Sequence, residues 1–502
     1  MSKKKIVLFF LCMTMIGLLS AQNSKEQKKP YLVVDFAGDE LDMMLDICHK
    51  GGFERLVQSK PFSSFGHYEW NEEFARDGEK SVVRMVKTAK NAGVNLGVLV
   101  QSDAISVDDP FFAPKYFKHL KRQGEVELYD EINADTRDIV LRRNDVMKAP
   151  STLNLILIED EMIIYGTMEF AGEMVLLHRC TRGAYGTKKV PHNVDAEAYK
   201  IWDSPERYVE PDDYLRGLVR QELTEKLNGV GINFVLYKGD EGQEILDESI
   251  RVRQVERWEN DGVKNGSLGW FLLRTADKKR KNTTMEDLEW MLSKAASFNA
   301  GYGMVIDAKV ITDYSMFDDM LEAMKQWNQL IKKDAFTASQ KELMKDPYID
   351  WHLEEQDGAF MLYPIDLSRR YQCNFTEDEP GLLTTEKWEW TSEKEERFGL
   401  RIFVEGEKEI RNPMINTEKG LVLFPCTIRP GQTLVYDFKD VAYVVDANHK
   451  VLEETAIEGI SVLPEGSSEV YLICEVDPGE ERPVVTVRYI IREEPEEIHP
   501  KK

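Results

Sequence analysis

The sequence predicts an α/β fold: a TIM-type (β/α)8 barrel with a β-rich insertion after its third strand and a carboxyl-terminal antiparallel β-sandwich. Three observations predict this organisation. Short apolar runs alternate with helical stretches over residues 31–118 and again over 205–334, as they do in βαβ units with a parallel sheet. Residues 119–204 interrupt this alternation with short β-rich runs. Residues 335–502 contain strand-like runs without intervening helices, which is typical of a β-sandwich.

The first 30 residues are predicted to be an export signal followed by a linker. Lys3–Lys5 form a basic start, Ile6–Leu19 form an apolar run, and Ser20-Ala21 offers a small-residue cleavage site. This pattern is typical of a secretory signal peptide, residues 1–21, and the apolar run is short for a membrane span. Residues 22–30 form a polar linker. We therefore expect a secreted or periplasmic protein with no membrane span.

Composition bounds the possible partners and cofactors. The 502 residues are 42% hydrophobic, which is ample for the cores of two to four domains. The formal net charge of −24 argues against nucleic acid or an anionic membrane surface as the main partner. The sequence contains no HExxH, P-loop, GxSxG or complete dinucleotide fingerprint. No metal and no cofactor are therefore predicted.

The cysteines are few and widely spaced. Cys48, Cys180, Cys373, Cys426 and Cys474 follow the leader without any CxxC pair. This spacing argues against a zinc site and against a disulfide-rich scaffold. Most of these side chains are expected to be buried small hydrophobes. One disulfide among the last three of them remains open for an exported chain.

The first half of the barrel is predicted from residues 31–118. Its elements are, in order, a strand over Tyr31–Phe36, a helix over Leu41–Cys48 closed by Gly51-Gly52, a strand over Arg55–Gln58, a helix over Ser81–Ala92 closed by Gly93, and a strand over Val94–Gln101. Glycine just past the last periodic residue is a usual helix stop. A long aromatic and polar loop follows the second strand.

The inserted region, residues 119–204, is predicted to be a small β domain. Its strand-like runs are Ile156–Glu159, Met162–Tyr165, Glu173–Leu177 and Ala198–Ile201. The segment Arg179–Thr187, followed by His192, has the glycines of a tight loop. This alternation is ordinary hairpin patterning, so we expect a structural role for the insertion.

The helix–strand alternation resumes at residue 205. Apolar residues recur at three- to four-residue spacing from Leu215 to Leu227, which predicts an amphipathic helix. Asn228-Gly229 is expected to end this helix. Ile232–Tyr237 then forms a short buried strand, and Lys238, Asp240 and Glu241 follow it among glycines.

The remaining barrel elements are a strand over Gly269–Leu273, a helix over Met285–Asn299, a strand over Gly301–Ile306 and a helix over Phe317–Leu330. Six of the eight strands of a closed barrel are therefore visible, and residues 244–267 have room for one more. An incomplete or distorted barrel therefore remains open.

The functional site of an α/β barrel lies at the carboxyl ends of its strands. The polar and aromatic residues predicted there are Asp35, His67, Tyr68, Trp70, Asn71, Gln101, Asp103, Lys238, Asp240, Glu241 and Asp307. Carboxylates and amides can hydrogen-bond sugar hydroxyls, and aromatic rings can stack on sugar faces. An oligo- or polysaccharide is therefore the predicted partner.

Hydrolysis of a glycosidic bond needs two carboxyl groups that flank it. Asp240 and Glu241 are adjacent in sequence, so a pair from two strands, Glu241 with Asp307, is geometrically more natural. Three structural alternatives remain open. The adjacent acids can solvate a turn, Asp307 can cap a helix, and His67 can hydrogen-bond within its loop.

Three segments resemble successive strand-end segments of secreted glycoside-hydrolase-like barrels from polysaccharide-degrading bacteria, related to the α-galactosidase type. These are Gly66–Asn71, Ile105–Pro110 and Tyr237–Gly242, and the inserted Arg182–Thr187 hairpin also resembles some of these proteins. The resemblance covers roughly residues 31–330 and implies hydrolysis of O-glycosidic bonds by a two-carboxylate mechanism.

The chain departs from this resemblance at two places. Strand three reads Val98-Leu99-Val100 where a polar residue or a histidine is expected. Such barrels often carry Phe-Asp-Gly where this chain has Tyr237-Lys238-Gly239, so a cation replaces an anion. A catalytically silent glycan-binding protein on the same scaffold is therefore the alternative to an enzyme. A purely structural surface protein is a third possibility, but it leaves the polar and aromatic loops unexplained.

Overall fold

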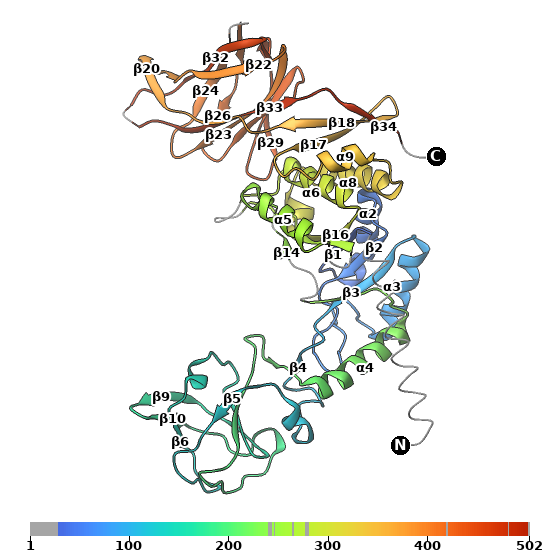
Figure 1. Ribbon diagram of the computed structural model, residues 1–502, viewed down its shortest axis with the longest axis vertical. Coiled ribbons are helices and arrows are strands. Elements are labelled where there is room, and N and C mark those ends of the chain that lie inside the picture. Colours follow the sequence, from blue (N-terminus) through green and yellow to red (C-terminus); the bar gives the residue numbers. More distant parts are fainter. Residues whose placement is uncertain are drawn as a thin grey trace. The chain divides into compact units, whose positions relative to one another are not determined.

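The computed structural model describes residues 29–238, 243–244, 246–263, 266–276, 281–417, 420–479 and 481–499 (Figure 1). The chain divides into two compact units. Unit 1 comprises Met1–Val34, Leu45–Leu56 and Gly242–Lys502, and unit 2 comprises Asp35–Met44 and Val57–Glu241. The division falls within strand β2, and each unit is described by itself below. The predicted signal peptide lies outside the described residues.

The α/β part of the chain is built on one sheet. Its strands are β1 (Tyr31–Val34), β2 (Arg55–Gln58), β3 (Asn95–Val100), β13 (Val235–Tyr237), β14 (Gln243–Glu244), β15 (Ser267–Leu272) and β16 (Gly301–Ile306). Their order is β13-β3-β2-β1-β16-β15-β14. The pairs β1–β16, β3–β13, β14–β15 and β15–β16 are parallel. The predicted alternation around a parallel sheet is therefore confirmed.

The predicted ring of eight strands is not seen, because the described residues form seven strands with β13 and β14 at the two ends of the order. Most of the segment expected to hold a further strand is helical instead. It forms the short helix η5 (Glu248–Ile250) and then α5 (Arg251–Asn260), which buries Val255 and Trp258. Burial of a large apolar face at helical spacing decides in favour of a helix here.

Unit 1 covers its strands with helices α5, α6 (Met285–Phe298), α7 (Ala308–Asp313), α8 (Phe317–Lys332) and α9 (Ala338–Leu343), together with most of α2 (Leu41–Gly51). Helix α6 starts at Thr284, whose side chain forms a reciprocal capping box with Asp287. All ten residues from Leu288 to Ser297 are buried. Such a helix is surrounded by protein on every side, so even its Lys294 is shielded from water.

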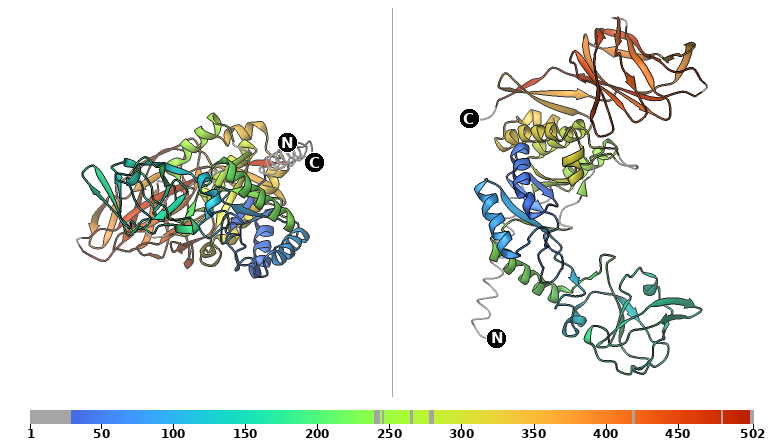
Figure 2. Two further views of the ribbon diagram at one scale, coloured as in Figure 1. Left: turned by 90° about the horizontal axis from the view of Figure 1, so that it is seen from below. Right: turned by 180° about the vertical axis from the view of Figure 1, so that it is seen from behind.

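The carboxyl-terminal part of unit 1 is an antiparallel β-sandwich, as predicted (Figure 2). Its strands are β17 (Asp350–Gln356), β18 (Ala359–Asp366), β19 (Arg370–Gln372), β20 (Phe375–Glu379), β21 (Leu382–Thr385), β22 (Trp388–Ser392), β23 (Glu396–Glu405), β24 (Ile410–Thr417), β25 (Gly420–Leu423), β26 (Thr427–Ile428), β27 (Thr433–Tyr436), β28 (Val441–Val445), β29 (Val451–Ala456), β30 (Glu458–Gly459), β31 (Val462–Leu463), β32 (Gly466–Glu475), β33 (Val484–Arg492) and β34 (Glu496–Ile498).

The two sheets of the sandwich share one apolar core. One sheet is built around β18-β33-β23-β27-β28 and the other around β21-β32-β24-β25. Trp390, Phe398, Ile415 and Tyr489 are among the buried core residues that both sheets contribute. The described cysteines are free thiols, so the disulfide left open among the last three is not formed.

Unit 2 contains β3, β13 and the helices α3 (Glu79–Asn91) and α4 (Asp213–Val230). The predicted amphipathic helix is α4. The Asp212 carboxylate caps its start by accepting from the Leu215 amide, and Gly231 ends it at a φ of 83°. Leu215 and Leu227 are both buried, so the predicted apolar face does pack against the unit.

The inserted domain lies in unit 2 and has its own core. Its strands are β5 (Arg122–Val126), β6 (Ile139–Arg142), β7 (Leu155–Ile158), β8 (Glu161–Ile164), β9 (Thr167–Ala171), β10 (Met174–His178) and β11 (Ala198–Ile201), with short helices η2 (Pro114–His119), η3 (Asp145–Lys148) and η4 (Ala184–Gly186). They form antiparallel sheets in the orders β6-β10-β9 and β5-β11-β7-β8. The chain enters and leaves through a ribbon of β4 (Ile105–Ser106) and β12 (Tyr208–Val209).

A buried ion network fixes the tight loop of this domain. The Glu161 carboxylate accepts from the Arg182 guanidinium through both Nε and Nη2, each at 2.8 Å, and from the Gly183 amide at 2.8 Å. His192 Nε2 lies 2.9 Å from the same carboxylate, and its Nδ1 lies 2.7 Å from Glu159. The glycines and the histidine of this segment therefore have structural contacts, as expected.

Candidate functional site

Polar side chains follow the carboxyl ends of four parallel strands, and all of them belong to unit 2. Asp35 follows β1, Lys60 follows β2, Gln101 and Asp103 follow β3, and Lys238 follows β13. The carboxyl ends of parallel strands lie at one edge of a sheet, which is where α/β folds place their ligand sites. We call these five residues the strand-end cluster.

Two ion pairs of the cluster are exposed to solvent. Lys60 Nζ lies 2.8 Å from the Asp35 carboxylate, and the two side chains are 70% and 47% exposed. The hydrogen bond to Asp35 raises the pKa of the Lys60 ammonium. Lys238 Nζ lies 3.9 Å from the carboxylate of Glu206. Exposed pairs contribute little stability, so ligand hydroxyls can replace either partner at low cost.

The second carboxylate of the cluster, that of Asp103, faces two arginines of α4. The Asp103 Oδ1 atom lies 3.0 Å from Arg216 Nε and 3.5 Å from Arg220 Nη2. The Ser102 hydroxyl donates to the same carboxylate oxygen at 3.3 Å. Asp103 is thus held in place by an element that is distant in sequence.

His67 is held by a buried aspartate, Asp109, which is not among the predicted site residues. Its Nδ1 atom lies 2.9 Å from Asp109 Oδ1, and its backbone amide donates to Asp109 Oδ2 at 2.7 Å. The imidazole ring also stacks on Phe111 with ring centroids 4.4 Å apart. The Asp109 side chain is 2% exposed and that of His67 is 33% exposed. With Nδ1 donating to Asp109, Nε2 is the ring atom left to meet a ligand.

Gly66 makes this arrangement possible. Its φ of 114° lies in the region that favours glycine, and a Cβ atom there would lie 2.4 Å from the Asp109 carboxyl. Only a residue without a side chain lets Asp109 approach so closely. The acidic pair before Pro110 was the sequence signal for this aspartate, but its partner lies 42 residues away.

Gln101 carries a buried acceptor without a partner. Its Oε1 atom is buried and has no hydrogen-bond partner among the described residues, while its Nε2 donates to the Tyr208 hydroxyl at 3.3 Å. The Tyr68 hydroxyl donates to the Gln101 backbone carbonyl at 3.1 Å. A buried acceptor is costly unless it is satisfied, so this oxygen is a place for a ligand hydroxyl.

The aromatic residues predicted to stack on a sugar are packed inside the protein. Tyr68 is 0% exposed, and its burial raises the pKa of its phenol. Trp70 is 8% exposed and lies against Phe62, with ring centroids 4.7 Å apart. The Asn71 side chain closes a turn by accepting from the Glu73 amide at 3.0 Å. These three residues support the loop that carries His67.

The predicted pair of catalytic carboxylates is not described as a pair. Asp240 and Glu241 lie outside the described residues. Asp307 belongs to unit 1, where its carboxylate caps α7 by accepting from the Val310 amide at 3.0 Å, so the helix-cap alternative describes its contact. The described residues contain no group of three or more His, Cys, Asp or Glu side chains placed to hold a metal ion.

No described helix is both long and apolar enough to cross a membrane. No protein-family model and no curated protein matches this chain.

Solved structures with a similar course of the chain include amylases and galactosidases. The α-amylase from Geobacillus thermoleovorans in complex with acarbose is 9% identical, with a TM-score of 0.30 over 89% of this chain and 98% of that one. The α-galactosidase from Lactobacillus brevis is 8% identical, with a TM-score of 0.34 over 91% of this chain and 56% of that one. The noncanonic maltogenic α-amylase from Thermotoga neapolitana is 7% identical, with a TM-score of 0.32 over 93% and 99%. These TM-scores are too low to carry an argument about this chain.

Proposed function

We propose that this protein is an exported carbohydrate-active protein that binds an oligo- or polysaccharide at the strand-end cluster and hydrolyses an O-glycosidic bond there. The observation that carries the proposal is the buried, unpartnered Oε1 atom of Gln101 at the edge where Asp35 and Asp103 also lie. Sugar hydroxyls donate and accept hydrogen bonds at once, so they suit an edge that offers an amide, carboxylates and cations.

Hydrolysis is assigned to Glu241 acting with a second carboxyl group. Lys238 stands three residues earlier, and a nearby cation favours an ionised carboxylate. Glu241 is therefore proposed as nucleophile or base, and Asp240 as the proton donor.

A glycan-binding protein without hydrolysis is the second candidate. It rests on one observation: Asp35, Asp103 and Glu206 each lie beside a cation. A carboxylate that is held by one cation keeps further lone pairs that accept hydrogen bonds from ligand hydroxyls. The described carboxylates of the cluster are therefore better suited to holding hydroxyl groups.

Turnover of chromogenic glycosides by Glu241→Gln separates the candidates. Loss of an acid–base group is expected to lower turnover by roughly two orders of magnitude, with little change in melting temperature. Glu256→Gln, an exposed position on α5, is the matched control. Full activity in Glu241→Gln would shift suspicion to Asp240 and Asp307. Glycan binding that His67→Ala weakens, in a parent without turnover, would establish the second candidate. A parent that neither binds nor cleaves glycans would remove both.

Export is tested on protein recovered from the producing cells. Mass spectrometry is expected to show a chain without residues 1–21, because the basic and apolar leader is the kind that signal peptidases remove. A cytoplasmic chain that retains Met1 would contradict export.

A further inference from the structure

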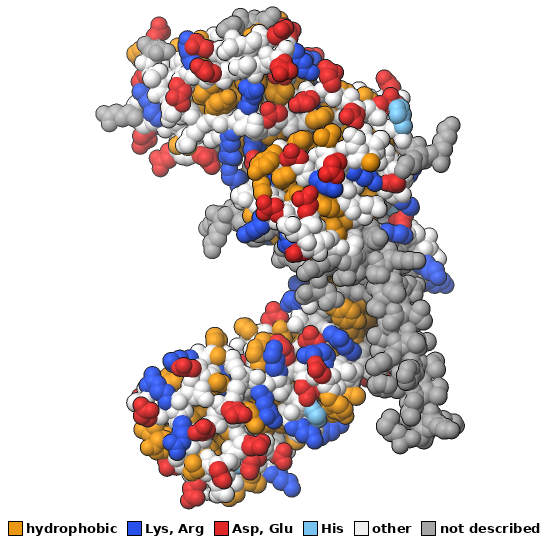
Figure 3. Space-filling model, viewed as in Figure 1, with side chains coloured by type: hydrophobic (Ala, Val, Ile, Leu, Met, Phe, Trp, Pro, Cys, Tyr) orange, Lys and Arg blue, Asp and Glu red, His pale blue; other side chains and the backbone are white. Residues whose placement is uncertain are grey.

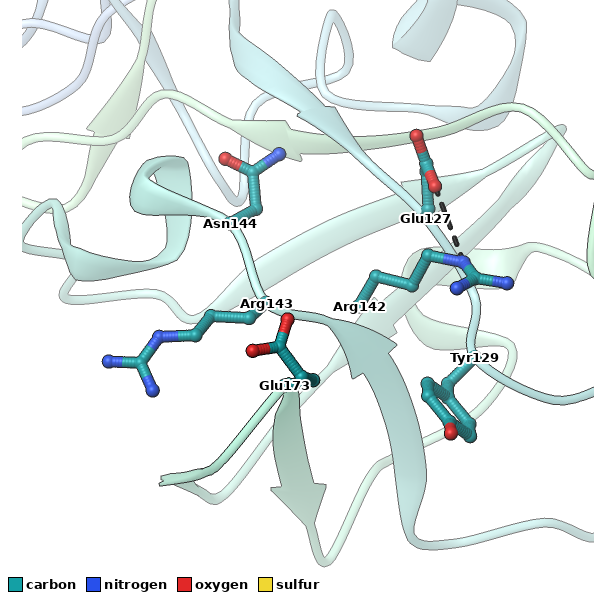
Figure 4. A pocket seen from close by; sticks show the side chains of 6 residues that line it. All are labelled: Glu127, Tyr129, Arg142, Arg143, Asn144 and Glu173. Atoms are coloured by element: carbon teal, nitrogen blue, oxygen red, sulfur yellow. Dashed lines mark ion pairs between the residues drawn. The ribbon is translucent and has the colours of Figure 1, made fainter.

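The inserted domain carries a pocket that the proposed hydrolysis does not use. It encloses about 260 Å³ and is lined by Glu127, Tyr129, Arg142, Arg143, Asn144 and Glu173 (Figure 4). All six residues belong to unit 2. They come from three chain segments: the stretch after β5, the end of β6 with the residues that follow it, and the turn before β10.

The pocket stands on a rigid base. Leu128 and Leu141 are fully buried in the domain core, so the alternating side chains of Glu127, Tyr129 and Arg142 point outward. The Tyr129 amide donates to the Val140 carbonyl at 2.9 Å, and the Arg142 amide donates to the Glu127 carbonyl at 2.9 Å. The segments that carry the lining are thus paired through their backbones, and a ligand would meet preorganised side chains.

Two of the lining side chains are fixed by the protein itself. The side-chain Nδ2 of Asn144 donates to the Glu125 carbonyl at 2.8 Å, and its Oδ1 accepts from the Val146 backbone amide at 2.9 Å. Arg143 Nη1 donates to the Gly172 carbonyl at 2.7 Å, and its guanidinium lies over the Phe170 ring, 5.7 Å from the centroid. Asn144 and Arg143 therefore shape the pocket, and the other side chains present groups to a ligand.

The other side chains offer a ring face and free hydrogen-bonding groups. Tyr129 is 40% exposed, and the Arg142 guanidinium lies 5.5 Å from its ring centroid. Arg142 Nε lies 3.4 Å from the Glu127 carboxylate, so its two terminal amino groups remain available. The Glu173 carboxylate has no hydrogen-bond or ion-pair partner among the described residues.

We propose that this pocket binds one ring of a neutral sugar. Two arginines and two glutamates give it no net charge, so an anion would meet the glutamates and a cation would meet the arginines. Guanidinium and carboxylate groups side by side donate to and accept from neighbouring hydroxyls. The exposed face of Tyr129 takes the apolar face of the sugar. Acidic and basic side chains are also interspersed over the surface of the domain in Figure 3.

The alternative to a sugar site is an ordinary solvent-exposed surface whose side chains pair across neighbouring strands. A matched variant distinguishes the two. Tyr199 on β11 carries Arg122 over its ring at 3.5 Å, in the other sheet of the same domain and outside this pocket. Tyr129→Ala and Tyr199→Ala therefore remove the same kind of arginine–tyrosine pair. Only the first is expected to change sugar binding.

The measurement is retardation of the full chain in native gels that contain neutral polysaccharides, together with saturation-transfer NMR on neutral oligosaccharides. Tyr129→Ala is expected to weaken binding about tenfold, the scale of one lost aromatic contact. Glu173→Gln is expected to weaken it by about the same factor, because it replaces a charged hydrogen-bond acceptor by a neutral one. Tyr199→Ala is expected to bind like the parent.

The inference does not depend on the proposed hydrolysis. Measuring the pocket variants in a chain that also carries His67→Ala distinguishes sugar binding at the pocket from glycan binding at the strand-end cluster. Binding that survives His67→Ala and is weakened about tenfold by Tyr129→Ala supports the pocket, whatever the strand-end cluster does. Turnover of a small chromogenic glycoside is expected to be unchanged in Tyr129→Ala. The inference is overturned if Tyr129→Ala binds neutral sugars like Tyr199→Ala, if the His67→Ala chain binds none, or if the pocket prefers sulfated or acidic sugars.

Discussion

At the scale of single residues, the position of His67 depends on a neighbour without a side chain. Asp109 accepts three hydrogen bonds from His67 and Phe111, and Gly66 leaves the space for it. One imidazole nitrogen, Nδ1, is thereby engaged by Asp109. The alignment of this histidine is a property of the loop, not of the histidine alone.

Gly66→Ala is predicted to destabilise the protein by about 1–3 kcal/mol, because it combines a strained φ with a clash against Asp109. Denaturant unfolding measures the loss, and glycan binding is expected to weaken with it as His67 moves. Gly78→Ala is the control, since Gly78 has a φ of 59° but nothing within 4 Å of its would-be Cβ. Equal losses in the two variants would show that the contact with Asp109 is unimportant.

At the scale of elements, the inserted domain depends on the buried carboxylate of Glu161. Burial opposes its ionisation, but hydrogen bonds from Arg182 and His192 outweigh that effect and lower its pKa. Removing one partner of a buried pair leaves an uncompensated charge, which typically costs about 3–5 kcal/mol.

Arg182→Met is therefore predicted to lower the free energy of unfolding of the region that contains β7, β8 and β11 by about 3–5 kcal/mol. Hydrogen exchange of peptides from residues 155–201 is the measurement, and faster exchange is expected there. Lys148→Met, which removes the solvent-exposed ion pair with Asp145, is expected to leave the exchange unchanged. Unaltered protection in Arg182→Met would mean that the network does not hold the domain together.

Helix α6 carries a buried ionisable side chain, Lys294, which makes the stability of the protein depend on pH. Burial lowers the pKa of Lys294 to about 7, and its amino group donates to the carbonyls of Met344 at 2.5 Å and Asp346 at 2.7 Å. A neutral amine still has two hydrogens for these two acceptors. In the unfolded chain the same lysine stays protonated up to its ordinary value of 10.5.

The unfolded state therefore binds more protons than the folded state between about pH 7 and 10.5, so the contribution of Lys294 to the free energy of unfolding rises with pH in that window. The slope approaches about 1.4 kcal/mol per pH unit. Urea unfolding of the parent and of Lys294→Met from pH 7 to 9.5 measures it. The parent is expected to gain stability relative to the variant as the pH rises. Parallel curves would contradict the assignment.

At the scale of the whole molecule, local patterns predict single elements, whereas pairings between distant residues depend on the fold. The apolar period of α4 and the acidic residues at its start predict the helix, but the stop expected at Asn228-Gly229 is wrong, because the helix continues to Val230 and ends at Gly231. A strand-end aspartate before a helix looks the same whether it caps, as Asp307 does, or catalyses. The partnership of Asp109 with His67 depends on a fold that sequence spacing does not encode.

The same distinction explains the position of α5 and the burial of the aromatic rings. Residues 244–267 have room for a further strand, yet burial of Trp258 favours α5 there, and the seventh strand, β14, lies at the edge of that segment. Tyr68 and Trp70 occur in a polar loop, where composition predicts exposure, but the loop folds back and buries both rings. Burial is decided by packing partners, and no local pattern names them.

Because the chain enters and leaves the inserted domain through the paired strands β4 and β12, the domain can be removed or added as one unit. Beyond the ribbon, the Lys121 amide donates to the Glu210 carbonyl and the Asp212 amide donates to the His119 carbonyl, each at 2.7 Å. Where the chain departs and where it returns are thus one strand spacing apart, a gap that a turn of a few residues can close. A lineage could lose this domain, or acquire it by gene fusion at a loop, while the surrounding architecture stayed in register.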